Sequence, residues 1–137
     1  MVIKAKWTDA DFNNMGWHDC RLYAIKLLDQ RFNLSFDIDY MFRWHQTGFD
    51  ISPCVLTFFN VFDLKINLDY DGNLLCFISD INRLEARSPN GTRIWLYGIE
   101  CNVGSISFSA TGFEQTVKAP PTCSETQDLN RGHLVME

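Results

Sequence analysis

Strict alternation of apolar and polar residues marks residues 32–40 of the chain. The apolar members are Phe32, Leu34, Phe36, Ile38 and Tyr40, and the polar members are Asn33, Ser35, Asp37 and Asp39. Successive side chains of a strand point to opposite faces, so this pattern predicts a half-buried β-strand. Residues 62–70 repeat the pattern, and sheets with one buried and one solvated face are usually antiparallel.

Further strands are predicted between turn signals along most of the chain. They cover about residues 17–28, 55–61, 74–79, 81–87, 93–99 and 105–110. The strand at 55–61 is apolar on both faces and is expected at the centre of the sheet. Asp71-Gly72-Asn73 predicts a hairpin between the strands at 64–70 and 74–79. A two-turn helix is expected to begin at Thr8, a good N-cap residue, and to end at Gly16.

These elements predict a mainly β fold, in which an antiparallel meander forms a sandwich or a strongly curved sheet with one short N-terminal helix. A length of 137 residues is typical of one domain. We expect residues 1–118 to form a single β domain. Residues 119–137 are polar and rich in proline at their start, and they are predicted to be a C-terminal tail, partly docked on the sheet.

The register of the first hairpin follows from the alternation. A slip of one residue would move every side chain to the wrong face. A hairpin centred on Gln30 avoids this by placing three apolar pairs on the buried face: Cys20 with Tyr40, Leu22 with Ile38, and Ala24 with Phe36. The same register sets Arg21 opposite Asp39 on the solvated face.

The composition and charge of the chain bear on its binding partners, its compartment and its cofactors. The net charge of −5 argues against binding to nucleic acid or to an anionic membrane surface, since both need a basic patch. The N-terminus lacks the apolar run of a secretory signal, and no apolar stretch approaches the roughly 20 residues of a membrane span. Five scattered cysteines without a Cys-x-x-Cys pair favour free thiols in the cytoplasm. No metal site and no cofactor are expected.

A candidate functional surface gathers around the first hairpin. Its members are Trp17, His18, Asp19, Arg21, Asp37, Asp39 and Trp44. His18 is expected opposite Phe42 at the edge of the buried face, where a hydrogen-bonded structural histidine is favoured over a catalytic base. Asp37 and Asp39 share a strand face, as acid–base pairs do, but an exposed Arg21–Asp39 ion pair explains the same residues.

Several segments, taken in order, resemble a family of small uncharacterised bacterial β-rich proteins with a Trp-His-Asp … Asp-x-Asp-Tyr … Trp pattern. The matching segments are 15–19, 36–40 with Trp44, 53–58, 104–108 and 111–115, and Gln127 and Leu129 extend the match. The resemblance covers the chain from about Asp11 to Leu129. It implies a bacterial cytosolic β-rich domain, with no settled activity, cofactor or catalytic residue to carry over.

The leading functional hypothesis is a non-catalytic protein-binding module, of the type of an immunity protein in a bacterial toxin system. Its expected partner is a basic, toxin-like protein, because the chain is acidic. One alternative is a small hydrolase-like or ligand-binding enzyme that uses His18 with Asp19, Asp37 or Asp39. Another is a structural subunit whose partner is a second copy of the chain in a homodimer.

Overall fold

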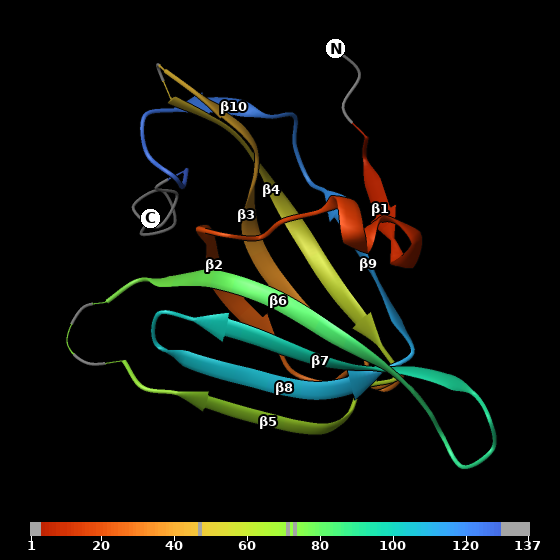
Figure 1. Ribbon diagram of the computed structural model, residues 1–137. Coiled ribbons are helices and arrows are strands. Elements are labelled where there is room, and N and C mark those ends of the chain that lie inside the picture. The colour runs from red at the N-terminus through yellow and green to blue at the C-terminus, as the bar shows by residue number, and fades with distance from the viewer. Residues whose placement is uncertain (1–3, 47, 71, 73, 130–137) are drawn as a thin grey trace.

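The protein is almost entirely β-structure. The computed structural model describes residues 4–46, 48–70, 72 and 74–129, except for the side chains of Trp44 and His45. Over this part of the chain, ten strands form one antiparallel sheet, and one short 3-10 helix follows the first strand (Figure 1). The predicted mainly β, antiparallel fold is confirmed.

The strands follow one another with short connections. They are β1 (Lys6–Thr8), β2 (Cys20–Lys26), β3 (Leu34–His45), β4 (Gly48–Phe59), β5 (Phe62–Leu68), β6 (Cys76–Arg87), β7 (Arg93–Cys101), β8 (Gly104–Ala110), β9 (Gly112–Val117) and β10 (Thr122–Ser124). Their order in the sheet is β1-β9-β4-β3-β2-β6-β7-β8-β5, and β10 pairs with the N-terminal end of β4. Strand β4 is interior, as its apolar sequence predicts, because β3 and β9 flank it.

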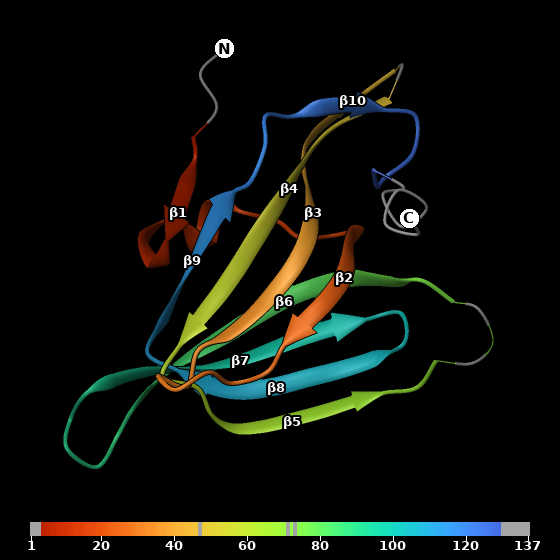
Figure 2. The same ribbon diagram turned by 180° about the vertical axis from the view of Figure 1, so that it is seen from behind.

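The sheet is bent so that its two halves face each other. Strands β6, β7, β8 and β5 lie across β2, β3, β4 and β9, and the two groups run in clearly different directions (Figures 1 and 2). The core fills the space between them. The ring of Phe58 on β4 lies 4.7 Å from the rings of both Tyr97 on β7 and Phe108 on β8, measured between centroids. A strongly curved sheet therefore describes the fold.

The short helix is η1 (Asp9–Asn14), which follows Thr8. The backbone N–H of Thr8 donates to the Asp11 carboxylate at 2.9 Å, so the predicted start of the helix is correct. The helix ends with Met15 as its C-cap and not with Gly16, and it is a 3-10 helix of six residues. A 3-10 helix suits such a short segment because it needs fewer residues per turn.

The register of the first hairpin is confirmed in one half and wrong in the other. Arg21 pairs with Asp39 and Leu22 with Ile38, as predicted. The register then shifts between Leu22 and Ala24, so that Ile25, and not Ala24, lies opposite Phe36. A bulge of this kind inserts one unpaired residue. It brings the larger Ile25 against the core and leaves Ala24 exposed.

The predicted hairpin between residues 64–70 and 74–79 is wrong. Strand β5 pairs with β8, whereas β6 pairs with β2 and β7. Asp71 and Asn73 of the predicted turn lie outside the described residues. The stretches 74–79 and 81–87 join into the single strand β6, with a register shift between Ile78 and Asp80. This long strand joins the two halves of the sheet, because its first residues pair with β2 and most of its length pairs with β7.

Ile38 points into the core, so its substitution tests which face of β3 is buried. Replacing Ile38, which is fully buried, by Asp would bury a carboxylate among apolar side chains. We expect the free energy of unfolding to fall by about 4 kcal/mol or more, measured by denaturant titration. Ser107→Asp is the matched control, because Ser107 is exposed on the opposite face of the sheet, and it should change stability by less than about 0.5 kcal/mol. Equal effects of the two substitutions would contradict this assignment of the buried face.

Candidate functional site

Trp17, the first of the predicted site residues, belongs to the core. Its side chain is buried, and its indole Nε1 donates to the Oε1 of Gln115 at 2.8 Å. Its ring packs against those of Phe12 and Phe113. The Trp17 indole N–H and the Gln115 side-chain amide lie where strand β9 meets the segment that leads into β2. Trp17 therefore anchors the start of β2 and offers no surface to a ligand.

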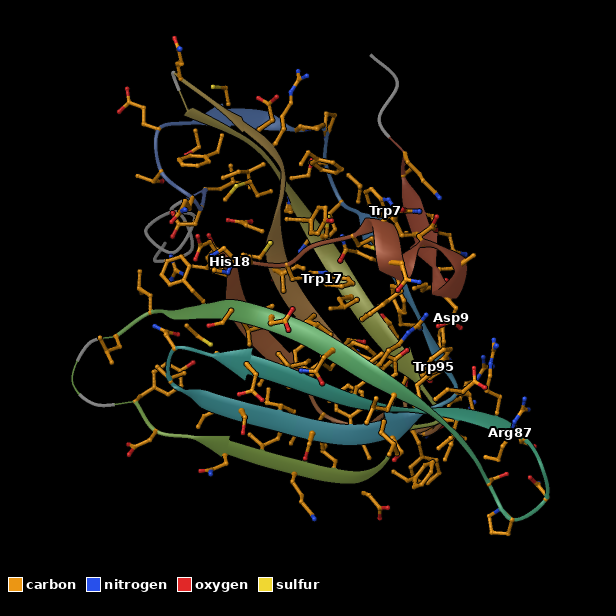
Figure 3. The ribbon with its side chains drawn as sticks, in the orientation of Figure 1. Trp7, Asp9, Trp17, His18, Arg87 and Trp95 are labelled. Atoms are coloured by element: carbon orange, nitrogen blue, oxygen red, sulfur yellow. The ribbon has the colours of Figure 1, made fainter. Side chains whose placement is uncertain are left out.

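His18 and Asp19 lie in a turn, where strand alternation does not apply. His18 is 77% exposed, so its predicted position opposite Phe42 on the buried face is wrong. Its Nδ1 lies 3.0 Å from the carbonyl oxygen of Ser79, and its Nε2 lies 3.4 Å from the Asp19 carboxylate. Asp19 has a φ of +64°, which turns its side chain back toward His18. Figure 3 shows His18 at the start of β2, beside β6.

An open pocket lies beside this turn. Its volume is about 410 Å³, and it is lined by His18, Asp19, Met41, Phe49 and Gln127. Cys20, the thiol nearest to the turn in sequence, is fully buried. Burial raises the pKa of the Cys20 thiol to about 12, so at neutral pH it carries its proton. Cys20 is therefore a packing residue and not a nucleophile.

The C-terminal residues cover the face that was predicted to be solvated. We name residues 122–129 the C-terminal clasp. Strand β10 pairs with β4, and the residues after it cross β3 and β2. The backbone N–H of Leu129 donates to Asp39 at 2.7 Å, and the side-chain amide of Gln127 donates to Asp19 at 3.0 Å. Asp39 is consequently fully buried.

The predicted exposed ion pair between Arg21 and Asp39 is replaced by a buried network. The Nη1 of Arg21 donates to Asp128 of the clasp at 3.0 Å, and both side chains are largely buried. The hydroxyl of Tyr23 donates to Asp39 at 2.5 Å, and the Arg21 guanidinium lies 4.4 Å from the centre of the Tyr23 ring. A buried carboxylate needs such donors. The network therefore binds the clasp to β2 and β3.

Asp37 and Asp39 lie on the same strand, and the contacts described for Asp37 differ from those described for Asp39. Asp37 accepts a hydrogen bond from the Lys118 ammonium group at 3.0 Å, at the partly exposed edge of the network. Trp44 lies in β3, and its side chain is outside the described residues. In the described ranges, no group of three or more His, Cys, Asp or Glu side chains is placed to hold a metal ion. Nor does any described helix have the length and apolarity to cross a membrane.

Sequence reasoning missed a second polar cluster, around Arg83 on β6. The Arg83 side chain is 8% exposed, and its Nη1 donates to Asp9 at 2.9 Å and to the Tyr97 hydroxyl at 3.2 Å. Its guanidinium lies 4.1 Å from the ring centre of Phe12 and 3.7 Å from that of Trp95. The sequence gives no clear signal of this cluster, because Leu84 and Ala86 are the apolar residues around position 83 and yet lie on the other face of the strand. An inward arginine requires a partner, and Asp9 of η1 provides it.

The outer face of β6, β7, β8 and β5 carries a ridge of apolar side chains. Leu84 and Leu96 are cross-strand partners, and they are 70% and 44% exposed. Ser109 pairs with Leu96 on one side and with Phe62 on the other, and it is only 5% exposed between them. Ile94 extends the ridge by one residue pair. Cross-strand partners share a face, so these side chains form one continuous surface.

Acidic residues lie on the same face, toward the opposite end of the strands. Asp80 and Glu100 are cross-strand partners, and both are exposed. Between them and the ridge lie small or polar outward residues, including Asn82, Gly98 and Ser107. None of the described segments crosses this face in Figure 1. We call the whole surface, from Asp80 and Glu100 to Leu84 and Leu96, the outer face.

Comparisons with known protein families, with curated protein sequences and with solved structures return no match to this chain. The resemblance that the sequence suggests therefore stays a prediction. The candidate sites are argued from the geometry of the chain itself.

The buried network predicts a specific effect of Asp39→Asn. The substitution removes the charge that accepts hydrogen bonds from Tyr23 and from the backbone of Leu129. Hydrogen bonds to charged groups contribute about 1.5–3 kcal/mol each, so we expect unfolding free energy to fall by about 2 kcal/mol. We also expect faster hydrogen exchange at the Leu129 amide.

Asp37→Asn is the matched control on the same strand. Asp37 is partly exposed and paired with Lys118, so this substitution should cost less than about 1 kcal/mol. Exchange at Leu129 should not change. If Asp37→Asn destabilised the protein as much as Asp39→Asn, the buried network would not be what holds the clasp.

Proposed function

We propose that this protein is a non-catalytic protein-binding module that recognises a partner protein through the outer face. The observation that carries the proposal is the cross-strand pair of Leu84 and Leu96, the first of which is 70% exposed. Leu84 is the most exposed large apolar side chain of the described residues. Contiguous exposed apolar side chains rimmed by polar groups are typical of protein interaction sites.

The shape and composition of the face favour a protein over a small molecule. Small ligands bind in concave pockets that bury most of their surface. An open sheet face with a central apolar ridge and a polar rim matches the organisation of protein–protein interfaces. Leu84, Leu96 and Phe62 would form the desolvated centre, and Asn82 and Ser107 would contribute hydrogen bonds at the rim.

The charge of the face favours a basic partner. Asp80 and Glu100 place two carboxylates on this face, toward the other end of the strands from the ridge, and Lys65 places one ammonium group on it. The face is therefore acidic, like the whole chain, whose net charge is −5. Complementary charges at an interface increase the association rate and select between partners. A basic toxin is a partner of this chemistry. Neutralisation of such a toxin, as by an immunity-type protein, is the biological role that we propose for this binding.

The residues of the predicted functional surface support a non-catalytic role only in part. Arg21 and Asp39 hold the clasp, and Trp17 is in the core. His18 and Asp19 border an open pocket of about 410 Å³, which is the observation that favours the alternative, a small ligand-binding or hydrolase-like enzyme. The two proposals place the functional residues on different elements, so substitutions separate them.

Leu84→Glu tests the outer face. Wild-type protein, Leu84→Glu and His18→Ala are immobilised, and proteins retained from a lysate of the source cells are compared by quantitative mass spectrometry. We expect a specific basic protein to bind the wild-type chain and His18→Ala. Its retention by Leu84→Glu should fall at least tenfold, which corresponds to about 1.4 kcal/mol, because a charge in the desolvated centre opposes binding.

Leu74→Glu is the matched control. Leu74 is 50% exposed, but it lies in the segment before β6, away from the ridge. Its substitution should leave retention unchanged. Equal loss with Leu74→Glu, or retention that Leu84→Glu does not affect, would contradict the proposal. Loss with His18→Ala alone would favour the pocket. Sedimentation of the wild type as a dimer that Leu84→Glu dissociates would favour the homodimer.

A further inference from the structure

Another open pocket, of about 540 Å³, lies at the base of the hairpin that joins β6 and β7. Its polar and aromatic lining residues are Thr8, Asp9, Asn13, Arg83, Arg93 and Trp95. Figure 3 shows Asp9 and Trp95 on the same side of the molecule, where the hairpin begins to project. Successive side chains of a strand point to opposite faces, so the Arg83 wall of this pocket faces away from Leu84 and the outer face.

One wall of the pocket is a fixed ion pair. The Arg83 side chain is 8% exposed, its Nη1 donates to the Asp9 carboxylate at 2.9 Å, and its Nη2 donates to the Asp9 carbonyl oxygen at 3.0 Å. A side chain at residue 112 would collide with the Asp9 carboxylate, so Gly112 allows β9 to pack closely against it. The charge of Asp9 is therefore compensated by Arg83, and this pair holds the shape of the pocket.

Arg93 is the second cation of the pocket, and its contacts are loose. Its side chain is 51% exposed, and its guanidinium lies over the Trp95 ring, 5.1 Å from the ring centre. Among the described residues, its ion-pair partner is Glu85 at 3.7 Å, a separation too long for a hydrogen bond. Glu85 also lies 3.9 Å from Arg87, so one carboxylate faces two guanidinium groups. The surroundings of Arg93 therefore carry positive charge, although the whole chain is acidic.

The Trp95 indole supplies a planar surface and an unpaired donor. Its Nε1–H is buried and has no hydrogen-bond partner among the described residues. Such a group is rare, because buried polar atoms are nearly always paired. On the opposite wall of the pocket, Asn13 is exposed on η1 and presents a side-chain amide. The pocket therefore combines a cation, an aromatic surface and polar groups, and small-molecule sites are built from this combination.

We propose that this pocket binds a small planar carboxylate, of the class of aromatic acids. The Arg93 guanidinium turns from the Trp95 ring toward the ligand and pairs with its carboxylate, whose geometry matches the guanidinium fork. The planar part of the ligand then takes the place of the guanidinium over the indole. An uncharged ring would leave Arg93 unpaired, and a carboxylate without a ring would leave the indole uncovered. The site is independent of the outer face.

The test uses the whole chain, isotopically labelled for NMR, and benzoate as the probe. Titrations follow the assigned indole N–H signals of the tryptophans. We expect the Trp95 signal to shift in a saturable way with a Kd of about 1 mM, which is in the range for so small a probe. The Trp17 signal should not move, because that indole is paired with Gln115 in the core. Benzyl alcohol, which keeps the ring, and acetate, which keeps the charge, should each bind about tenfold more weakly.

Arg93→Gln removes the charge that pairs with the carboxylate, so the Kd for benzoate should rise about tenfold. Arg87→Gln is the matched control, because Arg87 is the exposed cross-strand partner of Arg93 and does not line the pocket. It should change the Kd by less than about twofold, since exposed charges outside the contact contribute little.

Three outcomes would overturn the proposal: no saturable shift of the Trp95 signal, equal binding of benzoate and benzyl alcohol, or equal losses with Arg93→Gln and Arg87→Gln. Both arginines are exposed, so neither substitution removes a group that the core needs. The comparison of the three probes on the wild-type chain needs no variant.

Discussion

The packing of one half of the sheet against the other is the constraint on which the rest of the structure depends. A single antiparallel sheet has two faces, and the described residues form no helix layer that covers one of them. The sheet therefore bends and buries its inner face against itself, around the rings of Phe58, Tyr97 and Phe108. The bend leaves two outer faces. The clasp covers the one over β2 and β3, and none of the described segments covers the one over β6, β7, β8 and β5.

The buried carboxylate of Asp39 explains why the clasp is fixed. A carboxylate in this position would carry a large desolvation cost without donors, and Tyr23 and the backbone of Leu129 supply them. The Arg21–Asp128 pair adds a second contact of opposite charges. Because each group depends on the others, the network makes the position of the clasp specific rather than merely favourable. Asp39, one of the residues that suggested acid–base chemistry, is therefore part of the fold.

The alternation of apolar and polar residues correctly predicted the features that depend on one strand alone. It failed for the features that depend on contacts between segments far apart in the sequence. The faces of β3 and the pairing of Arg21 with Asp39 follow from period-two patterning, and both are found. The bulge after Leu22 places Ile25 rather than Ala24 against the core, and a single strand does not indicate which of these side chains fits there. The pairing of β5 with β8 depends on how the whole sheet bends. The sequence predicts that Asp39 is exposed to solvent, because nothing in residues 32–40 indicates that residues 122–129 will cover it. His18 approaches Asp19 only because a positive φ ends the alternation.

The open outer face is the feature that folding alone does not explain. Every inward position from Leu34 to Tyr40 is buried, so the chain has enough apolar residues to fill its core. Leu84 contributes nothing to that core, and a polar residue at its position would leave the sheet intact and more soluble. Within the described part of the chain, no segment covers Leu84 and Leu96. Their exposure, on the same face as Asp80 and Glu100, is the reason that we propose a partner protein for this surface.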